Sequence, residues 1–82
     1  MNTTAAAADY SQERAAVQTA LEAFFTKPGQ EPARAMNTER GYWEMTRGGA
    51  AFARIACEFK GGRLVIMTHA YRRVLATVDL PA

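Results

Sequence analysis

Hydrophobic and polar side chains alternate along residues 51–73, the stretch around which the rest of the chain is organised. In its first half, apolar and mainly polar residues form two interleaved sets, Ala53, Ile55, Cys57 and Phe59 against Arg54, Ala56, Glu58 and Lys60. This period of two predicts a β-strand with one buried face. Gly61-Gly62 fits the hairpin turn that follows, because glycine reaches positive φ without steric cost. Residues 64–67 are all apolar, which favours a strand inside the sheet over an edge strand.

Two more segments extend this hairpin into a predicted antiparallel sheet over residues 41–82. Residues 41–47 are typical of a strand with Trp43 and Met45 on one face, and Gly48-Gly49 supplies the next turn. The meander then continues through 52–59 and 64–71. Residues 74–80 are either a further strand or an extended tail that ends at Pro81.

Apolar residues recur at helical spacing ahead of the sheet, at Tyr10, Val17, Leu21 and Phe24. This spacing predicts an amphipathic helix over residues 9–26, after a flexible lead-in at 1–8. Pro28-Gly29 ends the helix, and residues 27–40 are expected to form a connector. The sequence therefore predicts a single α+β domain, with the helix packed on one face of a small antiparallel sheet.

The basic residues are concentrated in the strand half of the chain. The formal charge is only +2, but residues 1–39 carry three basic and five acidic side chains, whereas residues 40–82 carry seven and three. A basic surface most often meets phosphate, so nucleic acid is one candidate partner. A solvated sheet face is the alternative, and the charge pattern alone leaves both open.

Residue counts exclude several kinds of chemistry. One histidine and one cysteine do not make a four-ligand zinc site, and the glycine pairs lack the Gly-Lys-Ser/Thr sequel of a phosphate loop. Ser11, the only serine, is expected to cap the helix, and Cys57 to be a buried structural thiol. We expect no metal and no cofactor. The chain shows no membrane-spanning apolar run and no secretory signal, so a cytoplasmic location is expected.

The remaining candidate site combines arginine with aromatic residues: Arg47, Arg54, Arg72, Arg73, His69, Tyr71 and Tyr42. Arg54 is the informative member, because a lone charge on a central strand is costly without a partner. It either pairs with Glu44 or Glu58, or faces a groove that receives an anion. Arg72 and Arg73 offer phosphate contacts beside a stacking ring. His69 is either an acid or base that titrates near neutral pH or a satisfied polar residue.

The order of these features from Ser11 to Pro81 resembles the RelE/HigB superfamily of bacterial toxins, especially its phage-derived HigB-like branch. Four segments carry the resemblance, SQERAAVQTALEAFF, GYWEM, ARIACEFKGGRLVIM and THAYRRVLATVDLP. The resemblance implies an α+β fold and a metal-independent endoribonuclease that cuts messenger RNA in the ribosome. In that reaction the RNA's 2′-hydroxyl attacks its own phosphate. The implied partners are RNA, the ribosome and a cognate antitoxin.

By residue, the resemblance implies catalytic roles for Arg54, Arg73 and His69. Arg54 would stabilise the charged transition state, and Arg72 and Arg73 match the family's basic pair after its last long strand. His69 or Tyr71 would transfer protons. A further set is expected to bind the nucleic acid or another partner, namely Arg47, Arg72, Tyr71 and Tyr42.

The chain departs from the family pattern at both ends. It lacks the family's opening β-strand, as if truncated at its N-terminus, and VLATVDLPA holds no counterpart of the family's C-terminal catalytic tyrosine or histidine. Two alternatives therefore stay open. One is a non-enzymatic inhibitor from a phage or plasmid that engages a nucleic-acid-binding channel or an acidic protein through its sheet. The other is a homodimer formed through the exposed sheet edge.

Overall fold

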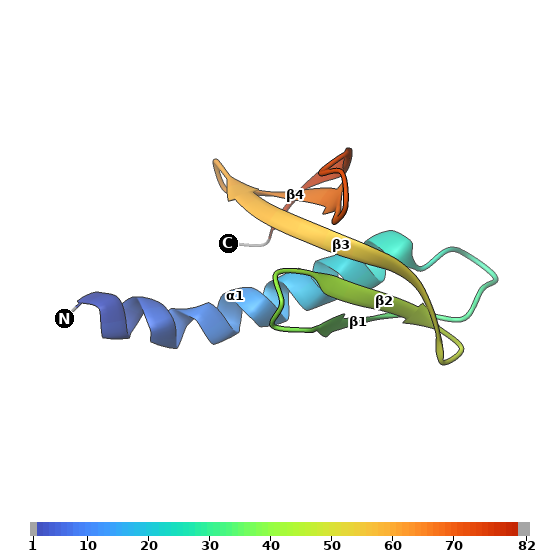
Figure 1. Ribbon diagram of the computed structural model, residues 1–82, viewed down its shortest axis with the longest axis horizontal. Coiled ribbons are helices and arrows are strands. Elements are labelled where there is room, and N and C mark those ends of the chain that lie inside the picture. Colours follow the sequence, from blue (N-terminus) through green and yellow to red (C-terminus); the bar gives the residue numbers. More distant parts are fainter. Residues whose placement is uncertain (1, 81–82) are drawn as a thin grey trace.

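The computed structural model describes residues 2–80, with side chains described for 13–80. One helix, α1 (Asn2–Phe25), lies against one face of a five-stranded antiparallel sheet (Figure 1). The strands follow one another in chain order, as β1 (Ala33–Asn37), β2 (Trp43–Arg47), β3 (Ala50–Lys60), β4 (Arg63–Thr68) and β5 (Val74–Asp79). The predicted α+β fold, a helix on an antiparallel meander, is confirmed.

β3 is the longest strand and joins two staggered halves of the sheet. Its first half pairs with β2, and its second half pairs with β4. The two pairings overlap only at Ile55, which lies opposite Trp43 on one side and opposite Thr68 on the other. Glycine pairs at positive φ make both turns of β3, as the sequence predicts. The start of β2, the middle of β3 and the end of β4 therefore meet at one place.

The core lies between α1 and the sheet. Val17 and Leu21 of α1 pack against Met45, Ile55 and the β4 residues Leu64 and Ile66, as the helical spacing and the strand alternation predict. Leu21 is fully buried, and burying a leucine side chain stabilises a fold by about 1.5–3 kcal/mol. The apolar stripe of the helix is thus a packing surface for one face of the sheet.

The prediction that 27–40 form a connector is wrong, because this segment contains β1. Ala33 and Ala35 are buried against α1, and Arg34 and Met36 are exposed, so the strand alternates as β-strands do. Alanine has a low β-propensity and the segment is short, so the sequence pattern is weak. Contacts with α1 therefore stabilise this strand, which its own residues favour only weakly.

Other predicted boundaries also change. α1 begins at Asn2, so the lead-in predicted at 1–8 is helical from its second residue. β4 ends at Thr68, because residues 69–73 form a turn in which the Arg72 N–H donates to the Thr68 carbonyl at 3.0 Å. Residues 74–80, predicted as strand or tail, contain β5. Tyr10 lies outside the residues whose side chains are described.

No helix within residues 2–80 is both long enough and apolar enough to cross a membrane.

Candidate nucleic-acid interface

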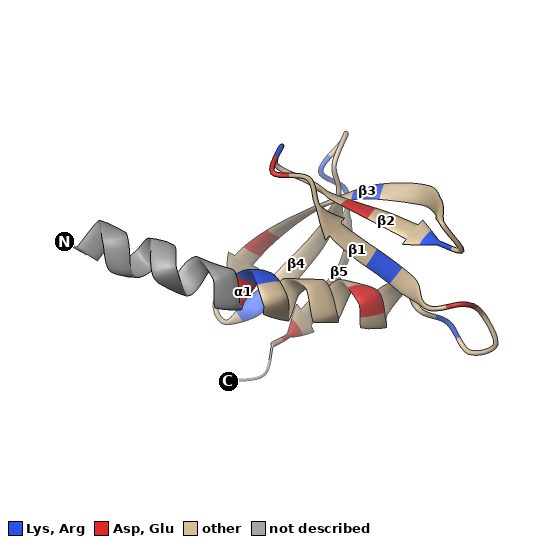
Figure 2. Cartoon of the chain, turned by 90° about the horizontal axis from the view of Figure 1, so that it is seen from below, with Lys and Arg blue, Asp and Glu red and all other residues tan. Residues whose placement is uncertain are grey.

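The face of the sheet turned away from α1 carries the candidate site, and we call it the open face. α1 lies on the other side of the strands, as Figure 2 shows. Along the ribbon, segments with Lys or Arg are interspersed with segments with Asp or Glu. The candidate site is therefore defined by particular contacts and not by a run of basic residues.

Three predicted residues come together on the open face, and we call them the arginine–aromatic stack: Arg54, Tyr42 and His69. The Arg54 guanidinium carbon lies 5.2 Å from the centre of the Tyr42 ring. The Tyr42 and His69 ring centres are 4.7 Å apart, with the ring planes tilted by 39°. Such distances allow cation–π and ring–ring attraction of roughly 0.5–1 kcal/mol each at an exposed site.

The register of β3 explains why these residues meet. Trp43 pairs with Ile55, so Tyr42 precedes β2 on the opposite face, next to β3. Thr68 also pairs with Ile55, and the His69 N–H donates to the Arg54 carbonyl at 3.0 Å. The two rings therefore approach the middle of β3 from opposite sides.

A small residue of β3, Ala56, lies close to this arrangement in the strand register. Ala56 is almost fully buried although it belongs to the open face, and its cross-strand partner Met67 is also buried. Neither residue belongs to the core under α1. Ala56 follows Ile55, the point of β3 that Tyr42 and His69 approach from opposite sides. Sequence reasoning missed Ala56; its signal was a small residue among the polar positions of this strand.

Among the side chains of residues 13–80, none forms an ion pair with Arg54. Glu44 is its cross-strand neighbour on β2, yet no ion pair joins them. The ion pairs among residues 13–80 are Arg14–Glu39 at 3.7 Å and Arg63–Asp79 at 3.1 Å, both exposed. Arg54 is exposed as well, so its guanidinium is held by a ring and remains open to an anion.

Tyr71, Arg72 and Arg73 lie in the turn between β4 and β5, one residue after His69. All three are exposed. The turn is fixed by Thr68, whose N–H donates to the Arg73 carbonyl at 2.9 Å and whose hydroxyl accepts from the Arg73 N–H at 3.1 Å. Arg72 adopts φ 55°, a left-handed conformation that costs a long side chain about 1–2 kcal/mol. The backbone places this basic turn beside Arg54, and within the described residues no side-chain bond joins them.

Arg47 lies apart from the other predicted site residues. Its Nη2 donates to the Phe25 carbonyl, at the end of α1, over 2.8 Å. Its guanidinium carbon is 4.4 Å from the Phe52 ring centre. A register shift between Met45 and Thr46 leaves Phe52 as an extra residue in β3, which turns its ring towards Phe25. Arg47 thus fastens the helix end to the sheet.

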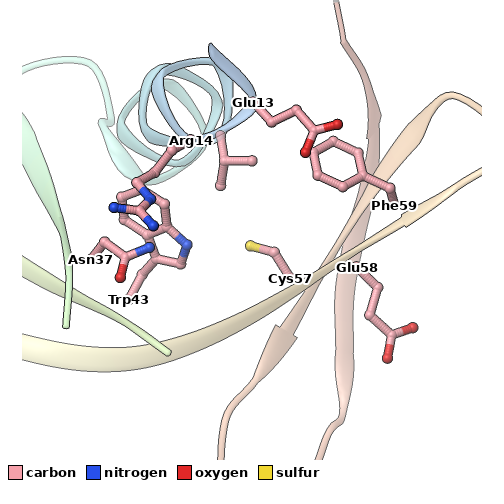
Figure 3. A pocket seen from close by; sticks show the side chains of 8 residues that line it. Glu13, Arg14, Asn37, Trp43, Cys57, Glu58 and Phe59 are labelled. Atoms are coloured by element: carbon pink, nitrogen blue, oxygen red, sulfur yellow. The ribbon is translucent and has the colours of Figure 1, made fainter. Parts of the chain in front are cut away.

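A separate pocket of about 160 Å³ lies between α1 and β3 (Figure 3). Figure 3 shows the Cys57 thiol pointing into it, with the Trp43 and Phe59 rings on either side. Burial raises the pKa of the Cys57 thiol to about 11. The thiol is therefore protonated at neutral pH, in keeping with the structural role predicted for it.

The described residues contain no group of three or more His, Cys, Asp and Glu side chains placed to hold a metal ion. His69 has a buried Nδ1 with no hydrogen-bond partner.

Comparison with protein-family models, with characterised proteins and with solved structures finds no match to this chain. The arrangement of the open face is therefore the basis for a function.

Proposed function

We propose that the open face binds single-stranded RNA, with a base stacking on the rings of Tyr42 and His69 and a phosphate held by Arg54. The observation that carries this proposal is the Arg54 guanidinium, which is exposed, held over the Tyr42 ring and not neutralised by Glu44. Aromatic rings beside arginine are the usual means by which proteins hold unpaired bases and their phosphates.

The neighbouring turn supports a path for the RNA backbone. Arg72 and Arg73 follow His69 after two residues, so two more guanidinium groups are available at the same corner of the sheet. Arginine matches the oxygens of phosphate with two parallel N–H donors. An RNA strand that stacks on Tyr42 would then continue across the turn towards β5.

RNA cleavage of the RelE/HigB type is a second candidate, favoured by the position of His69. His69 is next to Arg54 through a backbone hydrogen bond and is stacked on Tyr42. In this reaction the 2′-oxygen attacks the adjacent phosphorus and the bond to the 5′-oxygen breaks. His69 would take the 2′-hydroxyl proton, water would give a proton to the leaving 5′-oxygen, and Arg54 would stabilise the charge on the phosphate oxygens.

RNA binding is tested by fluorescence anisotropy with a labelled single-stranded RNA of roughly 12 nucleotides, at about 50 and about 200 mM salt. We expect Arg54→Ala to weaken binding about tenfold and to reduce the salt slope by about 0.7, the loss of one phosphate contact to a single strand. Lys27→Ala, which removes an exposed charge from the loop between α1 and β1, is the control and should leave affinity unchanged. Equal effects of the two substitutions, or no binding at the lower salt, would overturn the proposal.

Cleavage is tested by adding the protein to a translation extract and mapping the ends of the messenger RNA. We expect cuts within translated codons that disappear in His69→Ala and in Arg54→Ala. RNA that is bound by the intact protein but remains uncut would reject the toxin activity and retain the binding module.

A further inference from the structure

The two edges of the sheet differ in how their backbone groups are satisfied. At the β1 edge, the Ala33 N–H donates to the Thr26 hydroxyl at 2.9 Å, and the Ala35 N–H donates to Glu22 Oε2 at 3.1 Å. The Ala35 carbonyl accepts from Gln18 Nε2 at 3.0 Å. Gln18 and Glu22 of α1 and Thr26, the residue directly after it, are spaced by four and form one polar stripe. The stripe closes the β1 edge to another strand.

The β5 edge has no such cover. Among the described residues, no side chain and no loop backbone hydrogen-bonds to residues 74–79 on their outer side. Val74 and Leu75 are 59% and 42% exposed at the start of this strand. An exposed edge with apolar side chains is a template for a further strand.

An apolar groove continues from this edge towards α1. It has a volume of about 490 Å³ and is lined by the small side chains of Ala16, Ala20 and Ala23, by Phe24, and by Val78 and Leu80. Small residues on a helix let another backbone or helix approach closely. The groove and the β5 edge form one continuous surface, because Val78 belongs to both.

We propose that a second copy of this chain pairs with β5, strand to strand and antiparallel, so that two sheets become one and the two alanine-lined grooves close on each other. The charges at the two ends of β5 favour pairing with a second, antiparallel copy of the same strand. Arg72 and Arg73 precede the strand and Asp79 ends it, so antiparallel pairing brings the basic start of one strand to the acidic end of the other, twice. Parallel pairing would place arginine against arginine. Asp79 already contacts Arg63 through one carboxylate oxygen, which leaves the second for the partner.

This pairing has two consequences. Because the β1 edge is closed by α1, assembly stops at two copies. The open faces of both copies lie on the same side of the joined sheet, so the two arginine–aromatic stacks share one surface. The inference itself does not depend on RNA binding.

Sedimentation equilibrium across protein concentrations from about 1 µM to about 1 mM tests the pairing. The expected mass is twice that of the 9.0 kDa chain, with dissociation on dilution. Leu75→Lys should raise the dissociation constant at least about tenfold, because a lysine on the edge strand opposes pairing. Met36→Lys is the matched control, an exposed apolar residue on the closed β1 strand, and should leave the dimer unchanged.

A charge exchange tests the direction of pairing. Asp79→Arg should weaken the dimer, and adding Arg73→Asp in the same chain should restore it, while circular dichroism confirms that each variant keeps its fold. A monomer at every concentration would overturn the proposal, as would equal loss with Met36→Lys, assembly beyond two copies, or failure of the charge exchange to restore pairing.

Discussion

Arg47 and Arg54 belong to the same β2–β3 hairpin, but the fold uses them differently. The Arg47 guanidinium is turned under the sheet, where it bonds the Phe25 carbonyl and covers the Phe52 ring. The Arg54 guanidinium lies on the open face, over the Tyr42 ring. Arg47 thus stabilises the packing of the helix end on the sheet, whereas Arg54 remains available to a ligand.

This difference shows that the charge of a segment does not locate a site. Both arginines contribute equally to the basic strand half of the sequence. Strand alternation separates them, because Arg47 shares the face of Trp43 and Met45 on β2, whereas Arg54 lies opposite Glu44 on the other face. Substitutions on the face covered by α1 should therefore change the free energy of unfolding, and substitutions on the open face should change the affinity for RNA.

The largest expected effect is that of Leu21→Ala, on the covered side. Leu21 is fully buried at the centre of the core, so its truncation should lower the free energy of unfolding by about 3 kcal/mol, as buried leucines usually do. Urea unfolding followed by circular dichroism measures this change. Leu75→Ala removes the same atoms from the exposed β5 edge and should cost less than about 1 kcal/mol in a monomeric sample. Equal losses would mean that α1 does not form the core with the sheet.

The reactivity of the Cys57 thiol measures how well α1 covers this face of the sheet. With its pKa raised to about 11, the native thiol should carry up to about 100-fold less thiolate near pH 8 than the unfolded chain. Rates of iodoacetamide labelling between pH 7 and pH 11, with and without urea, measure this ratio. Between the unfolded and the native pKa, the native thiol keeps a proton that the unfolded chain loses. The stabilising contribution of Cys57 is therefore lost as pH rises from about 9 to about 11. Equal rates in both states would show that α1 leaves Cys57 uncovered.

Replacing Arg47 with methionine should lower the free energy of unfolding by about 2 kcal/mol. The variant keeps an apolar stem but loses a charge-assisted hydrogen bond at the end of α1 and the contact with Phe52. Arg34→Met makes the same change on β1, where the side chain is exposed, and should change the unfolding free energy by less than about 0.5 kcal/mol. If Arg47→Met instead weakens RNA binding and leaves unfolding unchanged, the separation of the two arginines fails.

Much of the fold was predictable because its signals are local. Alternation and paired glycines define β2, β3, β4 and their turns, and helical spacing defines the packed face of α1. β1 was not predictable, since its backbone depends on Glu22 and Thr26, which lie on another element. Its alanines and the nearby prolines indicate a connector when considered alone.

The composition of the candidate site was predictable, but its grouping was not. Sequence reasoning selected Arg54, Tyr42 and His69 together with four other residues of similar chemistry. Which of them meet depends on the single overlap of the two pairings at Ile55, and thus on where each hairpin turns. Alternation along β2 places Arg47 on the face of Trp43 and Met45, but its hydrogen bond to the Phe25 carbonyl depends on the helix end and is not visible in the sequence.

The smallest expected effect on folding is that of Arg54→Ala. Its guanidinium is exposed and makes no ion pair with any side chain of residues 13–80, so the free energy of unfolding should fall by less than about 1 kcal/mol, the worth of an exposed cation–π contact. Arg47→Ala, measured in the same urea titration, should cost more than twice as much. A loss of 2 kcal/mol or more at Arg54 would mean that it is paired with Glu44 in solution, and a paired arginine would not be available to phosphate. The contrast between the two arginines, and with it the case for an RNA-binding open face, therefore depends on Arg54 being nearly dispensable for folding.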